Sequence, residues 1–406
     1  MSVWDQAGEE AFSGFPAEVD IHPRADEAAA SALDSELLIV SPGIDTYGSY
    51  VAAYCEDVEE VIGEVELAAR LYQGRIVGIT GTNGKTTTTE LVSCMLKQAG
   101  LGGTACGNYG IPFAEVLLSD DLPQAVALEL SSFQLETIES LHPAVAVWLN
   151  FAPDHMDRYP TIEAYKRAKL RIFNNLTVGD VAVIPAGESL PDLSSRIVTF
   201  STEDLQADWY SDGEEIRHHN EVVLSMTKDT ALRGIHNAEN LMAAMASCRA
   251  LDIPMAVICQ ALRGYSPPFH RCELIRTLDG VEYLNDSKAT NVHALISALR
   301  SQTKPVVLIC GGKDKGLDYS GLMPLLPEKV LLVVTFGEIA ATLADVFTGT
   351  SPCEQVKTLA QAVTKARDLA PRGSVVLLSP GTSSFDQFSG YEQRGDHFRE
   401  LVQHLQ

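Results

Sequence analysis

Short runs of apolar residues alternate with longer amphipathic stretches through most of the chain. The apolar runs are strand-sized and lie at 75–79, 126–130, 145–149, 181–184, 306–310, 330–334 and 375–378. Helix-forming composition, with apolar residues at helical spacing, marks 87–99 and 238–251. Apolar strands separated by helices are typical of an α/β protein with largely parallel sheets.

A few segments break this alternation and suggest where domains meet. Segment 213–224 predicts a β-hairpin or an excursion from the main pattern, with His218, His219 and Asn220 at its turn. One seam is expected within 63–74, just ahead of a strand, and another at 265–268, where two prolines stop helix and strand alike. The predicted domains are therefore 1–65, 66–266 and 267–406.

Composition narrows the range of partners. The 406 residues include 30 Lys and Arg against 54 Asp and Glu, a net charge of −24. Such a chain is a poor partner for nucleic acid or an anionic membrane, so a few placed cations and a metal ion must hold any bound phosphate. No apolar run approaches the roughly 18 residues of a membrane span, and the eight scattered cysteines contain no C-x-x-C pair. We expect a cytoplasmic protein without membrane insertion.

The sharpest local motif is a glycine-spaced loop between a strand and a helix, Gly81-Thr82-Asn83-Gly84-Lys85-Thr86-Thr87. Glycines let the backbone aim successive N–H groups at an anion, and the helix N-terminus adds its positive dipole end. Lys85 would then reach the β- and γ-phosphates, and the Thr86 hydroxyl would bind Mg²⁺. Ile79 stands where a strict phosphate loop has glycine, and a ligand-free strand–helix turn is the alternative interpretation.

This loop and the blocks that follow it resemble the Mur ligases, the ATP-dependent amide-forming enzymes of peptidoglycan assembly. The matching blocks occur in the order of that family, and the match covers roughly residues 36 to 406. Besides the loop, they occupy 107–112, 129–136, 154–159, 168–172, 236–240, 270–271, 285–291, 311–316 and 378–388.

Three of the blocks resemble the members of this family that add D-glutamate. These are Ser131-Ser132-Phe133-Gln134-Leu135, the N-D-S-K-A-T-N block at 285–291, and Phe385-Asp386-Gln387-Phe388 with the nearby Glu392-Gln393-Arg394-Gly395. The resemblance implies a monomer that uses ATP and Mg²⁺ to join D-glutamate to UDP-N-acetylmuramoyl-L-alanine through an acyl phosphate. It also implies a three-domain α/β architecture, with a shortened N-terminal Rossmann-like domain, a central P-loop ATPase-like domain and a C-terminal Rossmann-like domain.

The resemblance assigns catalytic and metal-binding roles to a small set of residues. Lys85 acts on the phosphates, while Thr86, Glu129 and His155 bind magnesium, together with Lys169 once CO₂ has carbamylated it. Glu129 ends a buried strand and His155 follows the next one, which is where open α/β sheets place ligands. Taken alone, each of these residues has another interpretation: Glu129 as a surface acid at a strand end, His155 as a loop histidine and Lys169 as an exposed helix lysine.

The remaining assignments concern the nucleotide and the substrates. Nucleotide contacts are implied for 81–87 and for Asn237, Asn240, Arg271 and Asp286, although the two asparagines also suit a helix cap. An amino diacid needs a cation and several hydrogen-bond donors. The implied substrate residues are Asn108, Ser131, Lys288, Thr290, Lys315, Ser384, Phe385 (often leucine in relatives) and Tyr391.

The N-terminal region departs from the family pattern. The first forty residues contain no G-x-G after a strand, and the match resumes only at 37–44. We therefore expect this domain to lack the first strand, glycine loop, first helix and second strand of the family. Three explanations compete: the recorded start of the sequence lies downstream of the true start, the chain has been shortened, or the domain is genuinely reduced.

Two rival hypotheses remain at this point. One is another Mur ligase or a folylpolyglutamate synthetase-like ligase, against which the block at 385–388 argues. The other is a non-catalytic nucleotide-binding relative, suggested by the altered N-terminus. A binding role needs few of the residues that this chain keeps together, which argues against that second alternative; they are Lys85, Thr86, Glu129, His155, Lys169, Lys288 and Lys315.

Overall fold

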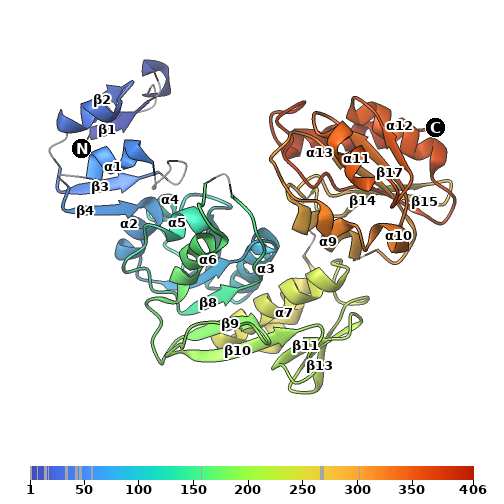
Figure 1. Ribbon diagram of the computed structural model, residues 1–406. Helices are drawn as coiled ribbons and strands as arrows, with labels where there is room; N and C mark the ends of the chain where they lie inside the picture. Colours follow the sequence, from blue (N-terminus) through green and yellow to red (C-terminus); the bar gives the residue numbers. More distant parts are fainter. Residues whose placement is uncertain are drawn as a thin grey trace. The chain divides into compact units, whose positions relative to one another are not determined.

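The computed structural model describes residues 2–6, 8–12, 16, 18–32, 35–41, 44, 48–55, 58–156, 158–265, 269–300 and 302–406 (Figure 1). Residues 266–268 of the predicted seam and residue 157 of the 154–159 block lie outside the described residues. Within the described part, no helix has the length and apolar character needed to cross a membrane.

Contacts divide the chain into two compact units, and each is described by itself. The first contains Met1–Gly81, Val92–Val198 and Ala246–Ile253. The second contains Thr82–Leu91, Thr199–Met245 and Pro254–Gln406. The dividing line passes through the glycine-spaced loop, between Gly81 and Thr82.

The N-terminal region holds two pairs of short parallel strands. The sequence analysis did not anticipate the first pair, because its four-residue strands are exposed or only half-buried and show no apolar run. In chain order the elements are β1 (Ser2–Asp5), η1 (Glu9–Phe12), β2 (Asp20–Pro23), η2 (Glu27–Ala32), β3 (Leu37–Val40), α1 (Ser49–Cys55) and β4 (Glu60–Gly63), with β1 paired to β2 and β3 to β4.

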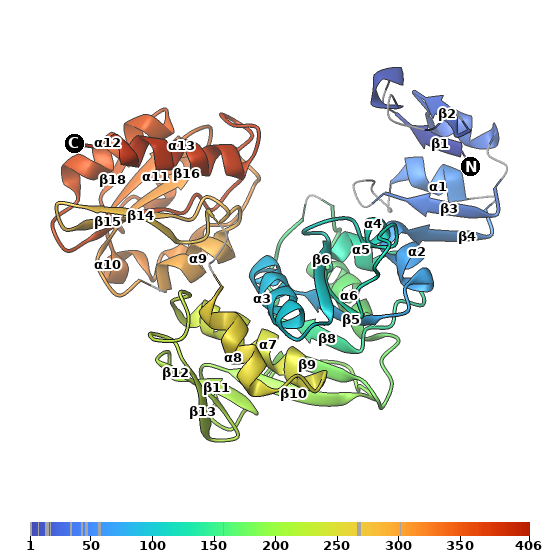
Figure 2. The same ribbon diagram turned by 180° about the vertical axis from the view of Figure 1, so that it is seen from behind.

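Among the described residues, nine strands form one sheet in the order β13-β12-β11-β10-β9-β8-β5-β7-β6 (Figure 2). The strands from β9 to β6 are mutually parallel, as the sequence predicted. Their bounds are β5 (Arg75–Thr80), β6 (Gly102–Gly107), β7 (Ala125–Glu129), β8 (Val145–Trp148), β9 (Val181–Pro185), β10 (Arg196–Ser201), β11 (Trp209–Ser211), β12 (Glu215–His218) and β13 (Glu221–Ser225).

The predicted hairpin at 213–224 is confirmed. Strands β12 and β13 are antiparallel, and His219 and Asn220 between them have φ of 47° and 70°. Two consecutive residues with positive φ form the kind of tight turn that matches the twist of a hairpin.

Helices cover the sheet and supply much of its core. On one face, α2 and the segment around Phe173 pack against β5, β7 and β8, with Trp148 fully buried among them. The helices are α2 (Glu64–Leu71), α3 (Lys85–Gln98), α4 (Phe113–Val116), α5 (Ser132–Leu135), α6 (Ile162–Leu170), η3 (Arg171–Phe173), α7 (Ile235–Ala250) and α8 (Met255–Arg263).

The C-terminal part of the chain builds a second sheet. In the stretch described from 269 onward, six strands follow the order β14-β15-β19-β16-β17-β18, and only the pair β14–β15 is antiparallel. The elements are β14 (Glu273–Leu278), β15 (Val281–Asn285), α9 (Val292–Arg300), β16 (Val306–Gly311), η4 (Ser320–Leu322), α10 (Leu326–Lys329), β17 (Val330–Phe336), α11 (Ala340–Phe347), β18 (Cys353–Gln355), α12 (Leu359–Leu369), β19 (Val375–Leu378) and α13 (Tyr391–Gln403).

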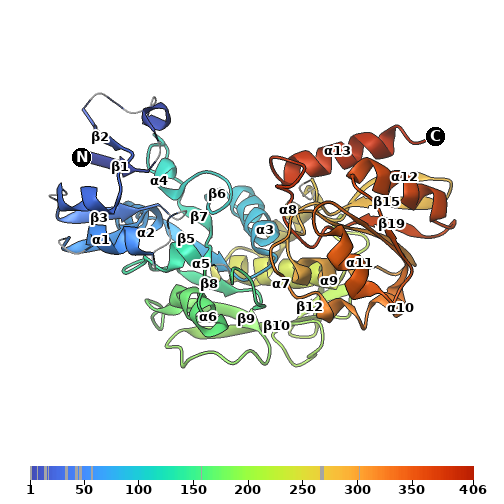
Figure 3. The ribbon, with the colours of Figure 1, turned by 45° about the horizontal axis from the view of Figure 1, so that its top comes forward.

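Both faces of this second sheet are buried by helices (Figure 3). Val306, Leu308 and Cys310 of β16 pack on the side of α9 and α11. Val307 and Ile309 pack on the opposite side, against α12 and α13. A strand covered on both faces needs apolar residues at every position, which explains the uninterrupted run in the sequence.

A buried carboxylate fastens α2 to the chain just before β8. Glu66 is fully buried, and its two oxygens accept hydrogen bonds from the backbone N–H groups of Glu139, Ser140 and Leu141 at 2.8–3.0 Å. The Ser140 hydroxyl and the Arg70 guanidinium also donate to it. Burial by itself raises the pKa of Glu66, but these hydrogen bonds outweigh it and hold the pKa below its ordinary value.

We expect Glu66→Gln to lower the free energy of unfolding by about 2–3 kcal/mol, because an amide nitrogen would face several N–H donors. Since folding lowers the pKa of Glu66, its stabilisation is complete above the unfolded carboxyl pKa of about 4.3 and is lost as the pH falls through the folded value. Urea unfolding at pH 7 and pH 4, followed by tryptophan fluorescence, should therefore show a smaller difference between wild type and variant at pH 4. The exposed control Glu115→Gln should stay within about 0.5 kcal/mol of wild type, and an equal loss in both variants would contradict the account.

Candidate active site

Most of the predicted site residues of the first unit follow the carboxyl ends of neighbouring parallel strands. The register pairs Ile79 of β5 with Glu129 of β7, and Glu129 with Gly107 of β6. Consequently Gly81, Asn108 and Glu129 emerge at one edge of the sheet, which is where open α/β sheets bind ligands. The loop that carries His155 follows β8, the neighbour of β5 on its other side.

The glycine-spaced loop has the backbone shape that its glycines require. It joins β5 to the start of α3, and Gly84 has φ of 83°. A Cβ on Gly84 would lie 2.2 Å from Oδ1 of Asn240, and a Cβ on Gly81 would lie 2.9 Å from Cβ of Leu149. The Lys85 ammonium donates to the Thr82 carbonyl at 2.9 Å. The loop thus places Lys85 and the first N–H groups of a long helix together, as an anion site requires.

The threonines of this loop are buried, with Thr82 and Thr86 each 6% exposed and Thr87 3% exposed. Lys288, which the sequence assigned to substrate binding, donates to the Thr86 hydroxyl at 3.4 Å. Lys288 therefore contacts the phosphate loop, and its ammonium also lies 5.1 Å from the centre of the Tyr391 ring.

The two asparagines at the start of α7 also contact this region. Asn240 is buried, its Oδ1 accepts from the Thr88 hydroxyl at 3.4 Å, and its amide donates to Oδ1 of Asn237 at the same distance. Asn237 in turn donates to the carbonyl of Arg233 at 2.8 Å. Asn240 is thus positioned beside the phosphate loop, whereas the Asn237 amide group serves the helix start.

Glu129 is buried, and only one of its oxygens is satisfied. Its side chain is 2% exposed, and Oε1 accepts from the Asn108 amide at 2.7 Å. Oε2 is buried and has no hydrogen-bond partner among the residues that the structure describes. Buried polar groups are normally paired, so an orphaned carboxylate oxygen at a ligand-binding edge calls for a cation or a donor from outside the chain. The alternative of a surface acid is wrong.

His155 sits in a strained loop surrounded by aromatic rings. Its φ is 57°, a left-handed conformation that a residue with a Cβ adopts at a cost. The backbone N–H of His155 donates to Oδ1 of Asp154 at 2.9 Å, and its ring lies 4.9 Å from Phe133 and 6.1 Å from Tyr165, centre to centre. The imidazole therefore has aromatic neighbours while 41% of the His155 side chain stays exposed.

Lys169 is buried on α6 and reaches the phosphate loop. It is 2% exposed, its ammonium donates to the Gly81 carbonyl at 2.8 Å, and it lies 5.0 Å from the centre of the Tyr165 ring. The alternative of an exposed helix lysine is therefore wrong. Carbamylation of Lys169 stays a prediction.

The predicted site residues suit a magnesium ion, which needs few protein ligands, better than a metal that is held entirely by protein side chains. Nowhere in the described chain do three or more His, Cys, Asp or Glu side chains gather into a metal-binding group. Magnesium is commonly held by one or two carboxylates plus substrate phosphates, with water completing its shell. In the first unit, the unpaired oxygen of Glu129 suits such a site.

In the C-terminal sheet, Asp286 follows β15 and is fixed by two donors. The Cys272 backbone N–H donates to its Oδ1 at 3.2 Å, and the Ser379 hydroxyl donates to its Oδ2 at 2.8 Å. Burial raises the pKa of Asp286 to about 7. The neighbouring Arg271 has a buried Nε with no partner among the described residues.

The predicted amino-acid residues lie on loops after β15, β16 and β19, three adjacent parallel strands. Lys313 and Thr382 tie two of these loops together, because the Thr382 hydroxyl donates to the Lys313 carbonyl at 2.5 Å. Individual members differ in burial. Ser384 is 2% exposed, Thr290 and Tyr391 are half-buried, and Lys315 and Phe385 are exposed.

Ser131 serves the local fold. It is the N-cap of α5, where its hydroxyl accepts from the Gln134 backbone at 3.2 Å and the Gln134 side chain reaches back in a capping box. Its predicted contact with substrate stays a prediction.

Some side chains that contact the predicted site residues could not be recognised from the sequence. Phe133 and Tyr165 lie beside His155, and Arg394 joins two loops of the C-terminal sheet. Phe133 and Arg394 lie within the quoted blocks at 129–136 and 392–395, but their sequence positions do not reveal what they contact.

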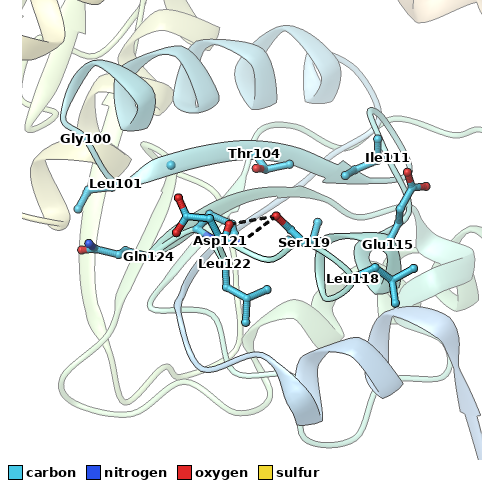
Figure 4. Close-up of a pocket in the computed structure, with 13 residues that line it drawn as sticks. Gly100, Leu101, Thr104, Ile111, Glu115, Leu118, Ser119, Asp121, Leu122 and Gln124 are labelled. Atoms are coloured by element: carbon cyan, nitrogen blue, oxygen red, sulfur yellow. Dashed lines mark hydrogen bonds between the residues drawn. The ribbon is translucent and has the colours of Figure 1, made fainter.

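A pocket of about 570 Å³ lies apart from these residues, along the edge strand β6 (Figure 4). Its lining, between Gly100 and Gln124, includes the carboxylates Glu115 and Asp121 and no lysine or arginine among the described lining residues. A pocket with this charge does not suit phosphate groups, and none of the predicted site residues lines it.

A glycine loop at the carboxyl edge of a parallel sheet, beside a buried carboxylate on the next strand, defines a phosphate-binding α/β protein. The family model "Mur ligase middle domain" matches residues 79–248, and "Mur ligase, glutamate ligase domain" matches 270–381. A curated relative from Salinibacter ruber, named UDP-N-acetylmuramoylalanine–D-glutamate ligase, is 40% identical over 93% of this chain and 86% of its own length. One of the same name from Myxococcus xanthus is 41% identical over 91% and 84%. The chain belongs to the Mur ligase family, in the branch of these D-glutamate ligases.

Solved structures support the fold. MurF from Acinetobacter baumannii matches with a TM-score of 0.64 and 17% identity, over 93% of this chain and 92% of that one. MurC from Thermotoga maritima matches with a TM-score of 0.60 and 18% identity, over 95% and 89%. The predictions of the family, of its α/β architecture and of an enzyme of the ligase class are confirmed, while the domain boundaries and the site residues stay predictions.

We expect Gly84→Ala to weaken ATP binding at least about tenfold, because a Cβ there would collide with Asn240 and displace the loop. Gly100 is the matched control, since it follows the same helix with φ of 73° and has open space where a Cβ would lie. Both substitutions carry a similar left-handed backbone cost of about 1–2 kcal/mol, so the collision with Asn240 is what distinguishes Gly84→Ala from its control. Titration with a fluorescent ATP analogue should separate them, and equal affinity in the two variants would show that the loop does not bind the nucleotide.

Proposed function

We propose that this protein joins D-glutamate to the L-alanine carboxylate of UDP-N-acetylmuramoyl-L-alanine, with cleavage of ATP to ADP and phosphate, as a step of peptidoglycan precursor synthesis. Two lines of support are independent of each other. Relatives that carry this substrate in their names align over 84–86% of their own length. The chain also presents a phosphate loop and a buried, half-satisfied carboxylate at the carboxyl ends of parallel strands.

The proposal rests chiefly on Glu129, whose buried carboxylate has one oxygen bonded to Asn108 and one oxygen without a partner among the described residues. A protein that merely bound a nucleotide as a scaffold would gain nothing from a buried carboxylate oxygen without a partner, which costs stability. A phosphoryl-transfer site does gain from it, because such an oxygen can hold a cation near the transferring phosphate.

In the first step, the γ-phosphoryl group of ATP passes to an oxygen of the alanine carboxylate. The bond between the γ-phosphorus and the bridging oxygen breaks, its electron pair leaves with ADP, and the new P–O bond gives an acyl phosphate. Lys85 and the N–H groups that open α3 would stabilise the negative charge on the phosphates. Positioning and charge neutralisation are the chief tasks of the protein in this step.

In the second step, the amino nitrogen of D-glutamate attacks the acyl carbonyl carbon. A C–N bond forms, the C–O bond to phosphate breaks with its electron pair on the phosphate, and the nitrogen loses a proton to solvent. A free carboxylate has no comparable leaving group, so the amide depends on the prior phosphorylation. Lys315, Thr290, Ser384, Phe385 and Tyr391 are the proposed contacts of the incoming diacid.

Magnesium, when bound, would neutralise the phosphate oxygens during transfer. Glu129, Thr86, His155 and a carbamylated Lys169 are the residues that we propose to hold it. Asn237, Asn240, Arg271 and Asp286 are proposed to contact the nucleotide, and Asn108 and Ser131 the UDP-linked substrate. The proposed enzyme acts as a monomer in the cytoplasm.

We expect ADP release to require ATP, UDP-N-acetylmuramoyl-L-alanine and D-glutamate together, with neither L-glutamate nor a diamino acid replacing D-glutamate. Lys85→Ala should lower turnover at least about a hundredfold, because it removes the cation placed against the transferring phosphate. Lys97→Ala, in the last turn of the same helix and exposed, should keep wild-type turnover.

A coupled assay for ADP, run across an amino-acid panel, measures all of these quantities. Turnover with a diamino acid or with a folate acceptor would favour the alternative ligases. ADP formation unaffected by Lys85→Ala would overturn the proposed role of the loop.

A further inference from the structure

Arg394 is a fully buried cation that has no acidic partner at close range. It lies in the first turns of α13 with none of its side chain exposed. None of the ion pairs among the described residues includes Arg394, whereas Arg399, further along the same helix, pairs with both Glu273 and Asp396. Burying an arginine without a carboxylate is costly, so its retention in the core requires a reason.

The guanidinium of Arg394 donates hydrogen bonds to two loops. Nε donates to the Ser287 hydroxyl at 3.0 Å and Nη2 to the Ser287 carbonyl at 2.8 Å. Nη1 donates to the carbonyls of Thr382 and Ser383, each at 3.2 Å. The planar fork therefore joins the loop after β15 to the loop after β19.

These loops carry the residues proposed to bind the amino acid. Ser287 directly precedes Lys288, and Thr382 and Ser383 directly precede Ser384. The third part of the cluster is α13 itself, because the Ser287 hydroxyl donates to the carbonyl of Tyr391 at 2.8 Å. One side chain thus fixes the relative positions of three segments of the proposed amino-acid site.

The positive charge of Arg394 is buried without a direct ion pair among the described residues. Its hydrogen-bond acceptors are carbonyl groups and a hydroxyl, and the carboxylates of Asp386 and Asp286 act on it only from a distance. Burial lowers the pKa of Arg394 to about 10, which still leaves it protonated at neutral pH. A buried cation in a chain of net charge −24 produces a local positive field of the kind that attracts an anion.

We propose that Arg394 is a positioning residue that sets both the geometry of the amino-acid site and its preference for an amino acid with two carboxylates. This inference rests on the proposed function. Geometry comes from the fork that holds the two loops, and preference comes from the buried positive charge that the fork carries. Lysine can supply the charge but not the fork, so the two contributions can be separated by substitution.

The test compares Arg394→Lys and Arg394→Gln by steady-state kinetics with D-glutamate and with D-glutamine, its neutral-side-chain counterpart. Arg394→Lys should raise the KM for D-glutamate about tenfold and leave the ratio of kcat/KM for D-glutamate over D-glutamine near that of wild type. Arg394→Gln should raise the KM similarly and also lower that ratio about tenfold. The KM for ATP should change less than about threefold in both variants.

Arg276→Gln is the matched control for losing a cluster of hydrogen bonds from an arginine to backbone carbonyls; Arg276 itself is half-buried. Arg276 donates to the carbonyls of Val402, Gln403 and Leu405 at the far end of α13, so its loss removes carbonyl hydrogen bonds away from the proposed site. This variant should melt at a lower temperature than wild type with an unchanged KM for D-glutamate. A purely structural role for Arg394 would instead make Arg276→Gln and the Arg394 variants alike.

Ser287→Ala decides the matter if the Arg394 variants fail to fold, because it removes one acceptor of the fork and keeps the charge. It should raise the KM for D-glutamate about threefold at constant selectivity, and an unchanged KM would overturn the proposal.

Equal loss of kcat/KM for both amino acids in Arg394→Gln would overturn the proposed role of the charge. Wild-type turnover without any dependence on D-glutamate would count against the proposed function, a failure that is distinguishable from these outcomes.

Discussion

A charged side chain that is buried in a protein needs a compensating partner. One carboxylate oxygen of Glu129 lacks such a partner among the described residues, and the proposed site of the first unit depends on this oxygen. Asn108 satisfies one oxygen of Glu129 at 2.7 Å and leaves the other buried without a partner in the described chain. The parallel register of β5, β6 and β7 brings this carboxylate to the sheet edge from which the glycine loop also emerges. Lys169 donates a hydrogen bond to the same loop, at the Gly81 carbonyl.

The second unit shows the same imbalance with the opposite sign. Arg394 is buried and donates to carbonyl groups and a hydroxyl, and it forms no direct ion pair among the described residues. An acidic protein that handles several anionic groups needs such local exceptions to its net charge of −24. Glu129 can hold a cation, and Arg394 can favour an amino acid with two carboxylates. Both features suit a ligase that acts on a nucleotide, a carboxylate and an amino diacid.

The sequence predicted what local patterns determine. The run at 306–310 predicted a strand because both faces of β16 are buried, and Gly81 and Gly84 predicted a loop shape that only glycine fits. The strands β1 and β2 were missed because they are short and largely unburied, so no apolar run marks them. The burial of Glu129 and Lys169, and the contacts of Arg394, depend on segments far apart in the chain and could not be derived from spacing alone.

The proposed reaction depends on an acyl phosphate, and transfer of an oxygen isotope would reveal whether one forms. The alanine carboxylate of UDP-N-acetylmuramoyl-L-alanine would be labelled with ¹⁸O, and the phosphate released during turnover would be analysed by mass spectrometry. The account predicts one labelled oxygen in each phosphate, because the bridging oxygen of the acyl phosphate leaves with phosphorus. Product formation accompanied by unlabelled phosphate would contradict it.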